Sequence, residues 1–236
     1  MFRLLIVLCL SVLALPAFGR TIELKDSKDF VRLVGEISES TVSQFIPDLT
    51  VAAESSKTVT VYVDSPGGSI GAGLRLLDAV DGLKANNPGL KLRCYAQFAA
   101  SMAFIFLQVA CDSRIVSQYS VLMQHQASLG MQGKWGEVQS RAALVKQLVD
   151  LLEIKTAARL KLSIAEYRAR VVNDWWLVGE TALREKAADF IGTVSCSAEL
   201  VKAGQCPLFI PNSGDGRSRA LSAPGVERSP ASPAGR

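Results

Sequence analysis

A strand, a glycine turn and a helix in direct succession constrain the fold of this chain more than any other feature. Residues 58–63 (TVTVYV) are β-branched and nearly continuous in apolar side chains or threonine, as expected of a strand covered on both faces in a parallel sheet. Residues 64–68 (DSPGG) end the strand, and from Ser69 the apolar residues take up helical spacing as far as the loop signal at residues 86–89 (NNPG). We therefore expect one strand–turn–helix unit here.

The same unit recurs on both sides of this segment. Strand patterns precede and follow it, and helical patterns separate them. The expected strands are 30–37, 90–96 and 114–121, and the expected helices are 40–53 and a segment that residues 98–100 lead into and that runs through Ala110. Alternating strands and helices predict an α/β fold with a parallel sheet.

A long helical segment is predicted from about residue 135 to residue 162. Apolar residues spaced three and four apart form one stripe along it, which consists of Trp135, Val138, Ala142, Val145, Val149 and Leu152. Core packing and an oligomer contact explain this stripe equally well. Ser163 and Glu166 match a capping box, so a further helix should begin there and lead to Asp174.

The two ends of the chain differ from the middle. Residues 1–19 contain Arg3, an apolar run over 4–15 and then PAFG, the pattern of a secretory signal peptide cleaved after Gly19. An uncleaved anchor is the alternative, but the run is shorter than the roughly 20 residues of a spanning helix. We therefore expect the protein to be exported, either periplasmic or secreted.

One domain over residues 20–210 is expected between the signal peptide and the C-terminal segment. Residues 211–236 are rich in Pro, Ser, Gly and Arg, so we predict a disordered tail. The formal charge of +4 falls largely on these two terminal segments, which leaves the domain nearly neutral. Without a basic surface, nucleic acid is not expected as a partner.

Four cysteines remain once the signal peptide is removed: Cys94, Cys111, Cys196 and Cys206. An even number in an oxidising compartment indicates disulfides, with three possible pairings. Cys196 with Cys206 is the first choice because the two are close in sequence and flank a short segment, whereas Cys94 and Cys111 need the fold to bring them together. Four reduced, buried thiols are the alternative.

Three separate segments carry candidate catalytic groups. Gly67 and Gly68 follow a buried strand and can turn backbone N–H groups toward a bound oxygen without side-chain obstruction. Ser101 stands at the start of a helix, where the macrodipole and the Met102 amide favour developing negative charge, although a serine that only caps the helix is the alternative. His125 is the single histidine, so any serine–histidine mechanism depends on it.

Together these motifs resemble those of the Clp protease proteolytic subunit family, in the family's order and over roughly residues 30–195. Residues 65–69 (SPGGS) resemble its oxyanion-hole turn, 99–103 (AASMA) its nucleophile segment and 123–126 (MQHQ) the segment with its histidine base. Residues 174–177 (DWWL) are similar in position to the segment with its aspartate.

The resemblance implies a serine endopeptidase with a Ser-His-Asp triad. Ser101 would attack the peptide carbonyl, His125 would transfer the proton and Asp174 would orient His125. The Gly68 and Met102 amides would hold the oxyanion, and Gly67 would line the substrate-binding site. The implied fold is ClpP/crotonase-like, with repeated β-β-α units, a parallel sheet and a long protruding helix.

Export separates this chain from the typical family member, which is cytosolic or organellar, forms stacked heptameric rings and receives chains from an ATP-driven unfoldase. We therefore expect an ATP-independent peptidase that acts on peptide or protein substrates without an unfoldase, with a homo-oligomer left open. No metal or other cofactor is expected, because the triad needs none and a single histidine offers few metal ligands.

Three alternatives remain. A catalytically inactive scaffold would use the glycine turn to hold a peptide without cleaving it. A hydratase or isomerase of the related crotonase architecture would use the oxyanion site for a thioester enolate, but export separates it from coenzyme A. A Ser-Lys hydrolase would use Lys134 or Lys146 as the base in place of His125.

Overall fold

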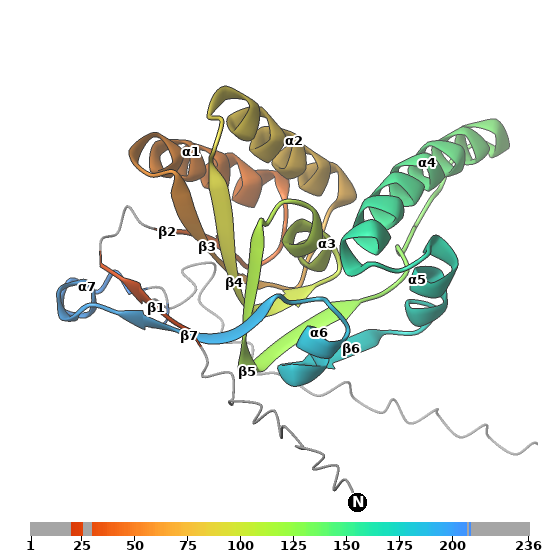
Figure 1. Cartoon of the computed structure of the whole chain (residues 1–236). Helices are drawn as coiled ribbons and strands as arrows, with labels where there is room; N and C mark the ends of the chain where they lie inside the picture. Colours follow the sequence, from red (N-terminus) through yellow and green to blue (C-terminus); the bar gives the residue numbers. More distant parts are fainter. Residues whose placement is uncertain (1–19, 26–29, 207, 209–236) are drawn as a thin grey trace, which may run out of the picture.

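The computed structural model describes residues 20–25, 30–206 and 208 (Figure 1). The predicted signal peptide and C-terminal tail lie outside these residues. The described elements are, in chain order, β1 (Arg20–Leu24), β2 (Phe30–Val34), α1 (Glu39–Ser55), β3 (Thr58–Ser65), α2 (Ile70–Asn86), β4 (Lys91–Ala100), α3 (Met102–Val109), β5 (Ser113–Gln124), α4 (Trp135–Leu160), α5 (Ile164–Arg170), β6 (Trp175–Val178), α6 (Glu180–Arg184), β7 (Phe190–Cys196) and α7 (Ala198–Lys202).

The strands form one seven-stranded sheet in the order β1-β7-β5-β4-β3-β2, with β6 paired to β5 outside this path. The β5–β6 pair is antiparallel, and the other strand pairs are parallel. In Figure 1, α1, α2 and α3 pack beside β2, β3 and β4, while α4 extends away from the sheet. The α/β fold with a parallel sheet and a long protruding helix is therefore confirmed.

The central strand β3 is buried on both faces, as its apolar sequence predicts. Val61 and Val63 belong to the main core, which the helices α1, α2 and α3 complete. Tyr62 points to the opposite face, into a smaller cluster where its ring stacks on Tyr95 at 6.0 Å between centroids. Burial raises the pKa of Tyr62 to about 12.

Two strands run further than the sequence pattern indicates. Residues 98–100, expected to lead into a helix, extend β4 instead and pair with residues 121–123 of β5. This pairing follows a register shift between Ala96 and Phe98, a long-range irregularity that local periodicity does not reveal. As a consequence, Ser101 is the first residue after β4, and His125 is the first residue after β5.

The helix α4 is anchored only at its C-terminal end. Among the stripe residues only Leu152 is buried, and Trp135 is 76% exposed. Core packing therefore explains the end of the stripe and not its beginning. After α4 the predicted capping box is confirmed: Ser163 accepts from the Glu166 amide, and the Glu166 carboxylate accepts from the Ser163 amide.

A partly buried ion-pair cluster fixes this C-terminal end of α4. The Arg114 side chain, 4% exposed, donates to both carboxylate oxygens of Asp189, and Arg159 in the last turn of α4 contacts the same carboxylate at 3.3 Å. Burial acts to raise the pKa of Asp189, but the hydrogen bonds and charge of Arg114 outweigh it and the pKa is lowered.

Both disulfides are present. Cys196 is bonded to Cys206, which confirms the first-choice pairing, and Cys94 in β4 is bonded to Cys111 just after α3. The Cα atoms are 5.8 Å apart in each pair, within the range a disulfide requires. Cys94 and Cys111 meet because α3 packs against β4.

Within the described residues, no helix is both long and apolar enough to cross a membrane.

Candidate active site

Ser101 occupies a strained turn between β4 and α3. Its φ of 53° and ψ of −120° lie in a region that non-glycine residues rarely adopt. The backbone on both sides holds this conformation, since the Ser101 amide donates to the Met123 carbonyl at 2.9 Å and the Ser101 carbonyl accepts from Ile105 at 3.1 Å. The Ser101 side chain makes no capping hydrogen bond, so the capping interpretation is wrong and the hydroxyl is left for other chemistry.

The glycine turn after β3 packs directly against this serine. A Cβ at Gly67 would lie 2.5 Å from the Ala100 carbonyl oxygen, 2.7 Å from the Ser101 Cβ and 2.8 Å from the Met102 nitrogen. The φ of Gly67 is also positive, at +89°. Only glycine fits such a close approach between backbones. The Gly67 carbonyl accepts from the Ile37 amide at 2.7 Å, which holds the turn in place.

Two backbone amides are available beside Ser101. Met102 is the first residue of α3, so its N–H has no acceptor within the helix. The Gly68 N–H takes no part in the hydrogen bonds that hold the turn. Gly68, Ser101 and Met102 line the same cavity. Two donors beside a serine can stabilise a developing oxyanion.

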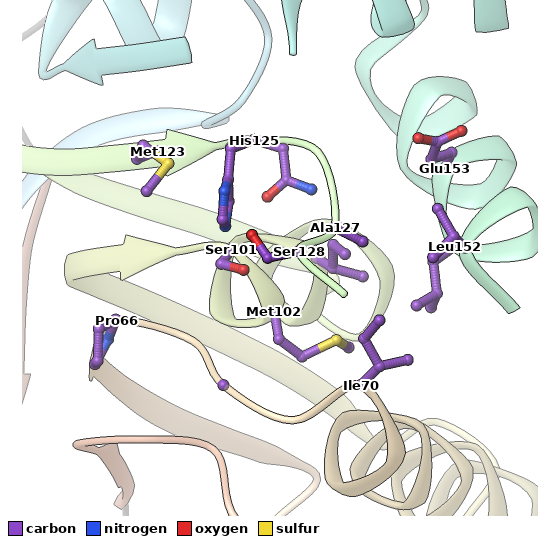
Figure 2. A pocket seen from close by; sticks show the side chains of 14 residues that line it. Pro66, Ile70, Ser101, Met102, Met123, His125, Ala127, Ser128, Leu152 and Glu153 are labelled. Carbon is purple, nitrogen blue, oxygen red and sulfur yellow. The ribbon is translucent and has the colours of Figure 1, made fainter. Parts of the chain in front are cut away.

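That cavity, of about 380 Å³, brings together residues that the sequence separates widely. The lining comprises Pro66, Gly68, Ile70, Ser101, Met102, Ile105, Met123, Gln124, His125, Ala127, Ser128, Val149, Leu152 and Glu153. Figure 2 shows the His125 ring directed toward Ser101. The structure therefore places the predicted nucleophile and the predicted base at one cavity.

Asp174 lies outside the cavity lining and is exposed. It immediately precedes β6, whose register pairs Trp175 with Gln124. His125 and Asp174 are thus the next residues at the same end of this two-stranded ladder. Within the described chain no hydrogen bond joins Asp174, His125 and Ser101. The structure brings Asp174 to the strand end that carries His125, but within the described chain it forms neither the Ser101–His125 nor the His125–Asp174 hydrogen bond of a triad.

The comparisons with known proteins identify the family. The Clp protease family matches residues 22–194, which is most of the chain. The chain belongs to the Clp protease family. It is 27% identical over 161 residues, covering 67% of this chain and 81% of the relative, to the ATP-dependent Clp protease proteolytic subunit 1 of Borreliella burgdorferi. This membership supports a serine-protease type of function and confirms the resemblance in the motifs.

Two further relatives of this Clp protease family member are similar to the same extent. They are the ATP-dependent Clp protease proteolytic subunits of Borrelia garinii subsp. bavariensis and Borreliella afzelii. Each is 27% identical to this chain over 161 aligned residues. These residues cover 67% of this chain in both cases, and 81% and 80% of the two relatives, respectively.

The cavity is also lined by residues that the sequence patterns did not predict. Ser128, Glu153 and the apolar side chains Ile70 and Ile105 line it together with two stripe residues of α4, Val149 and Leu152. The helical spacing of the stripe was the available signal, but spacing alone does not show which surface the stripe faces.

The two lysines considered as alternative bases do not line this cavity. Neither Lys134 nor Lys146 lines the cavity. The Lys146 ammonium is instead 2.6 Å from the Asp150 carboxylate in an exposed ion pair. In the part of the chain that the structure describes, no group of three or more His, Cys, Asp or Glu is placed to hold a metal ion.

Proposed function

We propose that this protein is a serine endopeptidase that cleaves peptide bonds with Ser101, His125 and Asp174. One observation carries the proposal: Ser101, strained and uncapped, shares a cavity with the single histidine of the chain. Strained backbone conformations cluster at active sites, where the surrounding structure holds a residue in a conformation it would not adopt alone. Membership of the Clp protease family supports the same reaction class.

In the proposed reaction, Ser101 Oγ attacks the carbonyl carbon of the scissile peptide while His125 takes the hydroxyl proton. The Gly68 and Met102 amides donate to the oxyanion of the tetrahedral intermediate. The intermediate collapses as His125 returns the proton to the leaving amine, which leaves an acyl-enzyme on Ser101. Water activated by His125 then hydrolyses this ester and restores the serine.

Asp174 would hold the second ring nitrogen of His125 and stabilise the imidazolium. Its position one residue beyond the paired Trp175 supports this role. The contact requires the Asp174 carboxylate to turn toward the ladder end where His125 lies. Gly67, predicted to bind substrate, does not line the cavity, and the space left by its missing Cβ is filled by the Ser101 turn, so we assign it the positioning of Ser101 instead.

We also propose that the protein is exported and acts without ATP or an ATP-driven unfoldase. The apolar segment over residues 4–15 and the two disulfides support export, since disulfides persist in oxidising compartments. Peptides and accessible protein segments are the proposed substrates. Exposed apolar side chains on α4, among them Trp135 and Leu144, favour a homo-oligomer.

A peptide-binding scaffold without hydrolytic activity is the second candidate. The observation that favours it is the missing hydrogen bond between His125 and Asp174 within the described chain. Such a scaffold would use the cavity and the glycine turn to bind peptides in the same way.

Labelling with a fluorophosphonate probe separates the two candidates. Wild-type protein without residues 1–19 should be labelled, and Ser101→Ala and His125→Ala should not be, because the probe reacts with an activated serine. Ser128→Ala is the matched control, since Ser128 lines the same cavity and its variant should still be labelled. No labelling of the wild type would refute the hydrolase and leave the scaffold. Labelling retained in His125→Ala would show that another group is the base.

A further inference from the structure

The wall of the cavity that α4 contributes is chemically mixed. Figure 2 shows Leu152 and Glu153 on α4, across the cavity from Ser101 and His125. Ile70, Ile105 and Val149 also line the cavity and are apolar. A carboxylate at the edge of an apolar cavity needs a partner for its charge. Where the protein leaves part of the carboxylate unpaired, a ligand side chain can supply the missing donor.

Glu153 is only half satisfied by the protein. Its side chain is 14% exposed, and Oε2 accepts from Arg168 Nε at 2.7 Å. Arg168 is shared with Asp150, to which it donates at 2.6 Å, and Asp150 is also paired with Lys146. The second oxygen of Glu153, Oε1, accepts no hydrogen bond within the described chain.

Gln124 is a second polar residue of the same cavity. This residue is 4% exposed and lines the cavity. Its Nε2 donates to the Tyr167 hydroxyl at 3.0 Å, whereas its Oε1 is buried without a partner. A buried, unpaired acceptor is costly, and this oxygen has almost no accessible surface, so it adds polarity to the cavity wall without contacting a ligand.

We propose that the cavity binds a lysine or arginine side chain of the peptide substrate, with Glu153 as the specificity-determining residue. These side chains carry only donors and match Glu153 Oε1, which accepts no hydrogen bond within the described chain. Their aliphatic stems pack on apolar surface while the charged head reaches a polar group, which suits Ile70, Val149 and Leu152. This inference rests on the proposed function and adds the substrate class.

Peptide binding to the Ser101→Ala protein tests the inference without requiring hydrolysis. Two blocked peptides, identical except for a central lysine or norleucine, differ only in the ammonium group. Calorimetry should show that the lysine peptide binds about 10-fold to 100-fold more tightly, as for a charged hydrogen bond. With Glu153→Gln added, the two affinities should agree within about twofold. Asp150→Asn is the matched control, because Asp150 accepts from the same Arg168 side chain. This variant should keep the preference for the lysine peptide.

The inference would be overturned if the Ser101→Ala protein bound the two peptides with equal affinity, bound the norleucine peptide more tightly, or bound neither peptide. A preference that survives Glu153→Gln would also overturn it, because Glu153 would then not be the determinant. Failure of the proposed hydrolysis is a separate result, since it is observed as missing Ser101 labelling in the wild type. A lysine preference without labelling would leave this specificity intact on a binding scaffold.

Discussion

The two sides of the cavity differ in how much of the fold holds them. On the strand side, Gly67 packs against the Ser101 turn with no room for a Cβ, and Met102 is buried. On the opposite side, α4 is buried only from Leu152 onward and Asp174 is exposed. Ser101, the proposed nucleophile, is therefore positioned by backbone contacts within the core. Asp174 is positioned by the β5–β6 ladder, and α4 by the packing and ion pairs of its C-terminal end.

This difference separates stability from activity along the chain. Changes on the strand side should damage the fold, because atoms there have no space to move. Changes on the open side should alter catalysis or binding while the fold persists.

The largest effect is expected for Asp174→Asn. If Asp174 orients His125, the rate of Ser101 labelling should fall by about 10³-fold to 10⁴-fold, because an amide favours the wrong imidazole tautomer. The free energy of unfolding should change by less than about 0.5 kcal/mol, because the side chain is exposed. The measurements are labelling kinetics and urea unfolding.

Asn173→Ala, on the neighbouring exposed residue, is the control for Asp174→Asn and should change neither property. Unchanged labelling of Asp174→Asn would remove Asp174 from the triad.

Gly67→Ala tests the strand side. We expect a loss of about 2–4 kcal/mol in the free energy of unfolding, because the new Cβ is strained at positive φ and overlaps Ser101 and Met102. Gly82→Ala is the matched control: Gly82 lies in α2 with nothing within 4 Å of its added Cβ, so stability should rise by up to about 1 kcal/mol. Equal stabilities for the two variants would show that the Gly67 contact does not constrain the nucleophile turn.

Asp189→Asn tests the anchor of α4. Removing the charge partner of the buried Arg114 should cost about 2–4 kcal/mol of unfolding free energy at neutral pH. Because the folded-state pKa of Asp189 lies below its usual value of 3.8, its stabilisation is complete above that pH and is lost as the pH falls through the folded-state pKa. The difference between wild type and variant should therefore shrink in acid.

The same unfolding measurements on Asp150→Asn provide the comparison for Asp189→Asn. Asp150 is paired with Lys146 and Arg168 at the surface, where solvent screens the charges, so its replacement should change the unfolding free energy far less than Asp189→Asn at any pH. A difference between wild type and Asp189→Asn that stays constant with pH would contradict the role assigned to Asp189.

The smallest effect is expected for Leu144→Ser on the projecting part of α4. Leu144 is 55% exposed, so the unfolding free energy of the single chain should change by less than about 0.5 kcal/mol. Unfolding at two protein concentrations about tenfold apart distinguishes an interface residue, since subunit contacts make stability depend on concentration. A large loss that is independent of concentration would show that Leu144 packs within its own chain.

Sequence patterns alone determined the elements whose signals are local. The apolar run of β3, the helical spacing of α2 and α4, and the capping box at Ser163 all appear where they were predicted. Propensity, capping and side-chain periodicity act over a few residues, so a short window contains the information. The motifs around Ser101 and His125 were recognised for the same reason.

Tertiary structure alone decided which of these segments meet. Strand pairing extended β4 to Ala100, and β6 forms only as a partner of β5. The stripe of α4 faces the cavity at Val149 and Leu152 but solvent at Trp135, although its spacing is uniform. Glu153 reaches the cavity only because α4 packs on α3 and α5. Contacts between residues far apart in the chain depend on the whole arrangement of elements, and no local pattern encodes that arrangement.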